Sequence, residues 1–122
     1  MSWVVEFHQD FEPEFDALPE EVQNKLLARV SLLEIFGSEL GRPHVDTLNG
    51  SRYSNMKELR FQAAKGVWRV AFAFDSKRDA ILLVAGDKSG GSESRFYKQL
   101  IKTADNRFEA HLAQIINKKD EK

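Results

Sequence analysis

Two arginines, Arg60 and Arg69, lie in segments that otherwise have the composition of buried strands. Because side chains alternate across a strand, both arginines are expected on one face of two neighbouring strands. A guanidinium offers a planar fork of N–H donors that fits the oxygens of a phosphate group. The pair therefore predicts an anion-binding face. The strand positions alone leave one alternative open, in which both arginines pair with local carboxylates such as Glu58.

Lys88 and Tyr97 extend this candidate site toward the C-terminal part of the chain. Lys88 follows the last expected strand in a glycine-rich connection to a helix, whose N-terminal amides also favour an anion. That connection lacks the spacing of a P-loop, so a plain turn is the alternative. Tyr97 has Arg95 and Lys98 beside it, and a phenol among cations can stack on a base or transfer a proton. The alternative is a tyrosine that is simply packed at a helix edge.

Three further side chains are weaker candidates for binding or catalysis. His44 lies in a long expected loop, and its ordinary pKa near neutrality suits acid–base chemistry. Lys57 and Lys65 lie at a strand end and in a turn, where a solvated lysine is the default. The three histidines share no spacing typical of metal ligands, and the chain has no cysteine. We therefore expect no metal, cofactor or disulfide.

Charge is segregated along the sequence. Residues 1–40 contain two basic and nine acidic side chains, and residues 41–102 contain twelve basic and six acidic ones. The formal net charge is only −1, yet the basic middle predicts contact with a polyanion. The length of 122 residues predicts one domain over residues 1–122. The sequence has neither a signal-peptide pattern nor a bilayer-spanning apolar run, so we expect a cytoplasmic protein without a membrane partner.

The N-terminal part of the sequence predicts secondary structure that ends in a long loop. A strand, an acidic helical turn, an amphipathic helix and the loop are expected, in this order, over residues 3–7, 11–18, 19–36 and 38–55. Pro19 suits the first position of the helix, and Gly37 is a natural C-terminal stop. The loop is rich in Gly, Pro, Asn and Ser, and long ordered loops are often functional.

The C-terminal part predicts the strands and the helix that must position the candidate site. Three strands and a helix are expected over residues 56–62, 67–75, 80–85 and 93–116. Ser92 is a plausible N-cap of that helix, and residues 117–122 are expected to be a frayed tail. The strand over 80–85 is apolar on both faces, as a central strand would be.

The resulting order, β-α-α-β-β-β-α, predicts an α+β domain with a small, mostly antiparallel sheet. One face of the third strand has the larger apolar side chains, which are Trp68, Val70, Phe72 and Phe74. We expect both long helices to pack on that one face. Arg60 and Arg69 would then lie on the opposite face, which Ala71 and Ala73 would leave shallow and open.

Four stretches of the sequence together resemble one known group of proteins. They lie, in this order, at residues 41–51, 55–60, 67–72 and 94–98. Each stretch alone is weak, but the ordered set resembles the RelE/ParE toxin superfamily and, within it, the phage-derived HigB-like toxins. The resemblance covers nearly the whole chain and implies a RelE-like fold.

The resemblance also implies an activity, that of a metal-independent, ribosome-dependent mRNA endonuclease that inhibits translation. The catalytic residues that it implies are Arg69, Tyr97, Arg60 and Lys88. The implied RNA contacts are Lys57, Arg95, Lys98, His44 and Lys65. In this reaction the RNA 2′-hydroxyl attacks the phosphate, with Tyr97 or Lys57 as candidate base and Lys88 or His44 as candidate acid. One departure from the pattern is Glu58, where RelE has a lysine.

The partners implied by the resemblance are those of a type II toxin. They are a cognate antitoxin, of a helix-turn-helix, HigA-like kind, together with the ribosome and mRNA. An alternative is a ParE-like toxin that inhibits DNA gyrase by binding, without nuclease activity, because one fold serves both functions. A third possibility is a degenerate domain that only binds a partner.

Overall fold

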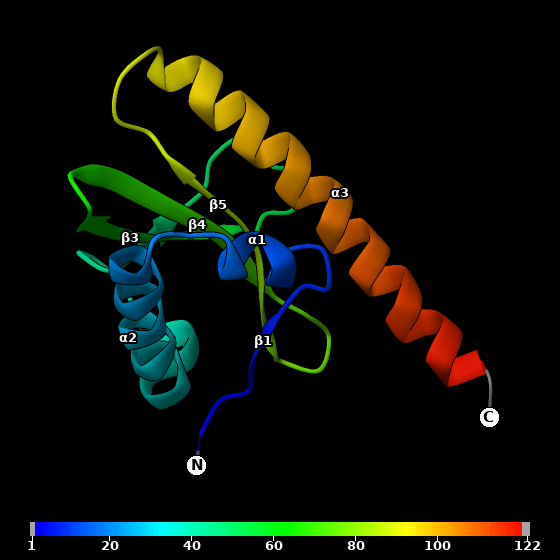
Figure 1. Cartoon of the computed structure of the whole chain (residues 1–122). Coiled ribbons are helices and arrows are strands. Elements are labelled where there is room, and N and C mark those ends of the chain that lie inside the picture. Colours follow the sequence, from blue (N-terminus) through cyan, green and yellow to red (C-terminus); the bar gives the residue numbers. More distant parts are fainter. Residues whose placement is uncertain (1, 121–122) are drawn as a thin grey trace.

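A five-stranded sheet forms the centre of the computed structural model, which describes residues 2–120, with side chains up to residue 117 (Figure 1). The strands are β1 (Val5–Phe7), β2 (Val45–Thr47), β3 (Lys57–Ala63), β4 (Gly66–Phe74) and β5 (Ala80–Asp87). They lie in the order β1-β5-β4-β3-β2, and all neighbours are antiparallel except β1 and β5. The predicted α+β class with a mostly antiparallel sheet is therefore confirmed.

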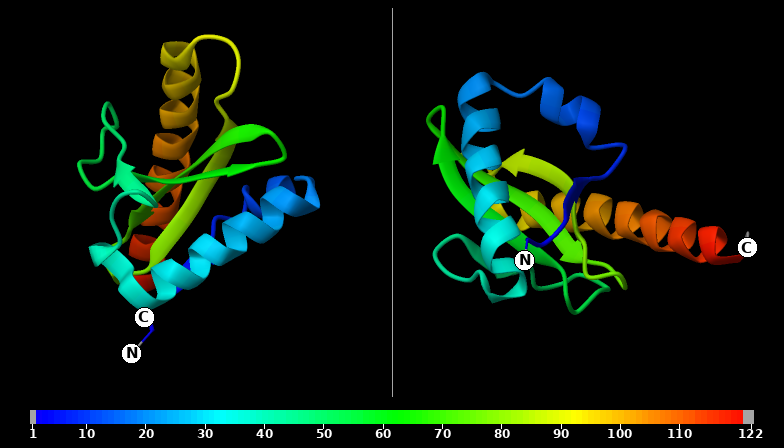
Figure 2. Two further views of the ribbon diagram at one scale, coloured as in Figure 1. Left: turned by 90° about the vertical axis from the view of Figure 1, so that its left-hand side faces the viewer. Right: turned by 90° about the horizontal axis from the view of Figure 1, so that it is seen from below.

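Helices cover both faces of this sheet. Within the described residues they are α1 (Glu12–Asp16), α2 (Glu20–Phe36), the 3₁₀ turn η1 (Gly37–Glu39) and α3 (Glu93–Asp120). The views in Figure 2 show α2 on one face of the sheet and α3 on the other. The prediction that both long helices pack on one face is therefore wrong.

Strand β4 explains why the two long helices lie on opposite faces. Its larger side chains, such as Trp68 and Phe72, belong to the hydrophobic core that α2 covers. Ala71 belongs to a second core, which contains Leu100 and Phe108 of α3. Small side chains leave room for a helix to pack closely against the sheet. The face that was expected to stay open and shallow is therefore the face that α3 covers.

The short strand β2 lies inside segment 38–55, which the sequence predicted as a loop. It pairs antiparallel with the beginning of β3, and a three-residue strand is too short to give a recognisable alternation. The rest of the segment is held by Asp105 of α3. Its carboxylate accepts hydrogen bonds from Ser51 Oγ at 2.5 Å and from the backbone N–H of Arg52 at 3.0 Å. The segment is long, but it is ordered.

Helix α3 is also tied to the N-terminal part of the chain. The Arg107 guanidinium donates two hydrogen bonds to the Glu14 carboxylate of α1, at 2.8 and 2.6 Å. It donates a third to the backbone carbonyl of Leu83 in β5, at 2.8 Å. One side chain therefore joins α1, the sheet and α3.

Helix α2 ends before Gly37, as predicted, but it begins at Glu20, so Pro19 is its N-cap and not its first residue. Helix α1 is shorter than the predicted 11–18. Helix α3 continues to Asp120, so residues 117–120 of the predicted frayed tail are helical. Residues 121–122 of that tail lie outside the described residues. In the described part of the chain, no helix has the length and apolar character needed to cross a membrane.

Replacing Phe108 by alanine should lower the free energy of unfolding by about 3–5 kcal/mol, because a large core side chain would be lost. Phe108 is only 2% exposed and lies in the second core. Ile116, on the same helix but 60% exposed, is the matched control. Ile116→Ala should change stability by no more than about 0.5 kcal/mol. Denaturant titration measures both, and equal losses would contradict the packing of α3 on this face.

Candidate functional site

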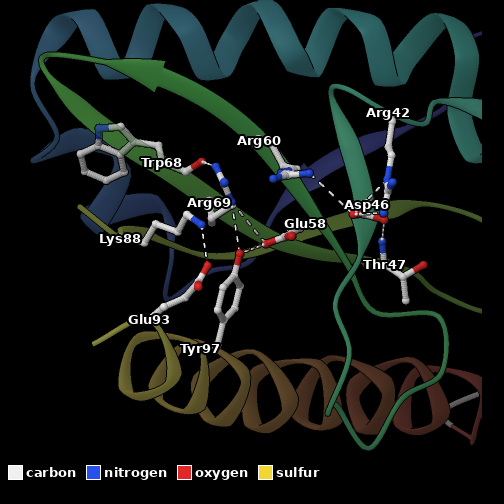
Figure 3. Close-up of polar contacts among 10 residues, drawn as sticks. All are labelled: Arg42, Asp46, Thr47, Glu58, Arg60, Trp68, Arg69, Lys88, Glu93 and Tyr97. Carbon is white, nitrogen blue, oxygen red and sulfur yellow. Dashed lines mark hydrogen bonds and ion pairs between the residues drawn. The ribbon is translucent and has the colours of Figure 1, made fainter. Parts of the chain in front are cut away.

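The candidate site lies where one face of the sheet meets the first turns of α3 (Figure 3). In the register of β3 and β4, Arg60 is directly opposite Arg69, and Glu58 is opposite Ala71. The two arginines therefore share a face, as the alternation predicted. Tyr97 points from α3 toward the same part of the sheet. Strand register and helix packing together create the site.

Glu58, Arg69 and Tyr97 form a closed triangle of polar contacts. The Tyr97 hydroxyl donates to Oε1 of Glu58 at 2.8 Å and accepts from Nε of Arg69 at 3.2 Å. Nε of Arg69 also lies 3.6 Å from the same carboxylate oxygen. Glu58 and Arg69 are only 6% and 5% exposed. A carboxylate and a guanidinium at such low exposure stabilise each other's charge.

Burial changes the proton affinities within this triangle. It is the main reason why the pKa of Glu58 is raised above its ordinary 4.5, and the hydrogen bond from Tyr97 and the charge of Arg69 oppose that rise. Burial, followed by the hydrogen bond to Glu58, also raises the pKa of Tyr97. Tyr97 is thus a neutral phenol that donates a hydrogen bond. Of the two groups, Glu58 is the better suited to accept a proton.

Arg60 is the more accessible of the two arginines, with 35% of its side chain exposed. Its Nη1 lies 3.6 Å from Oδ2 of Asp46, which also receives a hydrogen bond from Arg42. The hydrogen bond from Arg42 is the main cause of the lowered pKa of Asp46. In the free protein both Arg60 and Arg69 therefore pair with local carboxylates. An exposed pair of this kind is weak enough to exchange for a stronger anion.

Lys88 borders the triangle on the side of the loop that precedes α3. Its Nζ lies 2.7 Å from Oε1 of Glu93 and 5.8 Å from the centre of the Tyr97 ring. The hydrogen bond from Lys88 is the main cause of the lowered pKa of Glu93. Ser92 caps α3 as predicted, because its Oγ accepts a hydrogen bond from the backbone N–H of Arg95 at 3.2 Å.

The predicted RNA contacts do not all lie on the face of the sheet that carries this centre. His44 lies next to β3, where its carbonyl accepts a hydrogen bond from the Arg60 backbone at 2.8 Å. By strand alternation, the Lys57 side chain lies on the face opposite Glu58 and Arg60. The remaining predicted contacts are exposed, in the β3–β4 turn and on the first turns of α3, and are Lys65, Arg95 and Lys98.

Sequence reasoning missed three charged residues near the site. Glu58 is at its centre, although the sequence identified it only as a carboxylate partner in the alternative to an anion site and as a departure from RelE. Lys25 and Arg29 of α2 line a cleft together with Arg60 and Arg69. Their four-residue spacing, which puts both on one helix face, was the only signal. Among the described residues, no three His, Cys, Asp or Glu side chains gather closely enough to hold a metal ion.

Comparison with protein families and relatives agrees with the resemblance seen in the sequence. The profile of phage-derived Gp49-like proteins matches residues 13–109. The candidate toxin HigB3 of Mycobacterium tuberculosis is 46% identical over 99 residues, which cover 81% of this chain and 84% of that protein. The candidate toxin HigB2 of the same organism is 44% identical over 101 residues, or 82% of this chain. Those residues cover 50% of HigB2, so the chain spans half of that relative's length.

Solved structures with a similar fold include two RelE toxins. The free E. coli toxin RelE, as a double arginine-to-alanine mutant, has a TM-score of 0.57 at 12% identity, covering 83% of this chain and 95% of its own. The archaeal RelE–RelB complex of Pyrococcus horikoshii gives a TM-score of 0.53 at 19% identity, covering 75% of this chain and 100% of the other. At such low identities, these likenesses concern the fold alone.

Replacing Tyr97 by phenylalanine should raise the pKa of Glu58 further, because the hydrogen bond from the Tyr97 hydroxyl stabilises the charged carboxylate. Titration of the glutamate side-chain carbons by NMR measures this shift. Tyr53→Phe is the matched control, because Tyr53 packs on Phe108 and not on Glu58. An unchanged pKa in the Tyr97 variant would show that the hydrogen bond does not act on Glu58.

Proposed function

Because the chain belongs to the Gp49-like family and, with it, to the HigB-like toxins of the RelE superfamily, we propose that it is an mRNA-cleaving toxin. It would act on the ribosome, as the toxin of a type II toxin–antitoxin pair, and so inhibit translation. The observation that carries this proposal is the triangle of Glu58, Arg69 and Tyr97, flanked by Arg60 and Lys88. It combines a carboxylate of raised proton affinity with several cations.

In the proposed reaction, Glu58 is the general base. It takes the proton of the RNA 2′-hydroxyl, and the 2′-oxygen then bonds to the neighbouring phosphorus. Tyr97 and Arg69 both contact Oε1 of Glu58, so Oε2 is the oxygen that accepts the proton. A raised pKa brings the base closer to the operating pH, where general-base catalysis is most efficient. Glu58 thus replaces Tyr97 and Lys57 as the proposed base.

The arginines and Lys88 complete the proposed transfer. Arg69 and Arg60 stabilise the extra negative charge on the phosphorane, because their cationic donors are already in place. The bond between phosphorus and the 5′-oxygen breaks, and that oxygen takes a proton from Lys88 or His44. The products are a 2′,3′-cyclic phosphate and a 5′-hydroxyl, so the proton transfers balance without a further reactant.

The proposed partner is a cognate antitoxin of a helix-turn-helix, HigA-like kind. One similar solved structure is a RelE toxin in complex with RelB, which supports the expectation of such a partner. An acidic or apolar antitoxin segment over Arg60 and Lys88 would block access to the site. Ribosome and mRNA would then meet the toxin only after its release.

Tyr97→Phe and Arg69→Lys should each reduce mRNA cleavage by about 10²–10³-fold. The first removes the hydroxyl that holds Oε1 of Glu58 and so orients Oε2, and the second removes the guanidinium fork that stabilises the phosphorane. Arg69→Lys keeps a cation next to buried Glu58 and so avoids leaving a lone buried carboxylate. Expression in bacteria, with mapping of mRNA 5′ ends and of gyrase-linked DNA breaks, measures the effect.

Lys102→Ala is the matched control, because Lys102 is exposed on α3 and should leave both cleavage and growth inhibition unchanged. His44→Ala should reduce cleavage less than the two site variants. If Tyr97→Phe and Arg69→Lys stay fully toxic at unchanged thermal stability, the nuclease proposal is wrong. Gyrase-linked breaks without new mRNA 5′ ends would instead identify a ParE-like inhibitor.

A further inference from the structure

A cleft of about 490 Å³ opens beside the outer edge of β3. Strand β2 pairs with residues 57–59 of β3, and the carbonyl of His44 accepts a hydrogen bond from the Arg60 backbone. Within the described residues, no strand covers this edge from Phe61 onward. Helix α2 borders the cleft on one side, and the segment before β2 borders it on the other. The side chains that carry the argument are Lys25, Arg29, His44, Arg60 and Arg69.

Among the described residues that line this cleft, the charged side chains are basic and none is a carboxylate. Lys25 and Arg29 are the only basic residues within positions 1–40, where nine acidic residues surround them in sequence. Both nevertheless face the cleft. Nε of Arg29 lies 3.5 Å from the backbone carbonyl oxygen of Arg60, which places the guanidinium against the edge of β3. Arg60 pairs with Asp46 and Arg69 pairs with Glu58, each at 3.6 Å. Neither carboxylate is part of the lining.

The cleft adjoins the candidate catalytic centre. Arg60 and Arg69 line the cleft and also belong to the site that contains Glu58 and Tyr97. A chain of phosphates that enters the site at these arginines therefore meets Arg29 and Lys25 as it leaves. Proteins that bind single-stranded nucleic acid use a positive groove of this kind to follow the backbone.

We propose that this cleft binds the phosphodiester backbone of single-stranded RNA next to the scissile phosphate, with Lys25 and Arg29 as the phosphate-neutralising residues. The proposal rests on the nuclease function proposed above and names the path of its substrate. An acidic protein segment is the competing occupant. RNA is favoured because the cleft shares Arg60 and Arg69 with groups arranged for chemistry on a phosphate, which a peptide does not need.

The test compares Lys25→Gln/Arg29→Gln with wild type in binding a short single-stranded 2′-O-methyl RNA, which lacks the attacking hydroxyl. Affinity is measured over a range of salt concentrations. Each lost phosphate contact should reduce the slope of log K against log salt by about 0.7 for a single strand, and two contacts by about 1.4. Lys77→Gln/Lys102→Gln is the control, because it removes the same charge from exposed positions outside the cleft. Thermal unfolding shows that the variants are folded.

A slope reduced only in the Lys25/Arg29 variant supports the proposal. An unchanged slope, or an equal reduction in the control, overturns it. The proposal is also wrong if the cleft variant keeps its RNA slope but loses affinity for an acidic antitoxin peptide. The nuclease function is tested separately by mRNA cleavage with wild type. A wild type that does not cleave, combined with a reduced slope in the variant, refutes the nuclease while the cleft remains an RNA site.

Discussion

Glu58 and Arg69 are buried charged side chains that depend on each other and on the hydroxyl of Tyr97. Removal of one partner from a buried ion pair typically costs about 3–5 kcal/mol, because the other charge remains without compensation. Two of the three groups come from the sheet and the third comes from α3. The two hydrogen bonds of Tyr97 therefore form only when α3 packs on the sheet. The packing of α3 on the sheet is thus also what brings Tyr97 to the candidate site.

The sequence predicted the elements of this fold better than their arrangement. Apolar periodicity located α2 and α3 because a helical stripe repeats over many residues, whereas β2 is too short to show a pattern. The face on which α3 packs was predicted wrongly. The small side chains of Ala71 and Ala73 were interpreted as a surface open to solvent, whereas they leave room for a helix. A better signal was β5, whose two apolar faces both need cover. Ile81 and Leu83 indeed lie in the core beneath α3.

The candidate site was predictable where it depends on strand geometry and not where it depends on tertiary contacts. Period-two alternation placed Arg60 and Arg69 on one face, and the register confirms it. The role of Glu58 depends on Tyr97, 39 residues away, and on the depth of burial. The cleft residue Arg29 meets Arg60 across 31 residues of sequence. Neither contact leaves a local pattern, so neither could be predicted from spacing.

The hydrogen bonds between Glu14 and Arg107 join residues 93 positions apart in a chain of 122, so they close most of the sequence into one loop. Contacts of such high sequence separation form late in folding, because the entropy of closing the loop must be overcome first. A chain that is still being synthesised can therefore build the β3–β4–β5 meander from local contacts before α3 exists. The candidate site is completed only with the C-terminal quarter of the chain. The order of residues along the chain thus delays the candidate site until α3 has been synthesised.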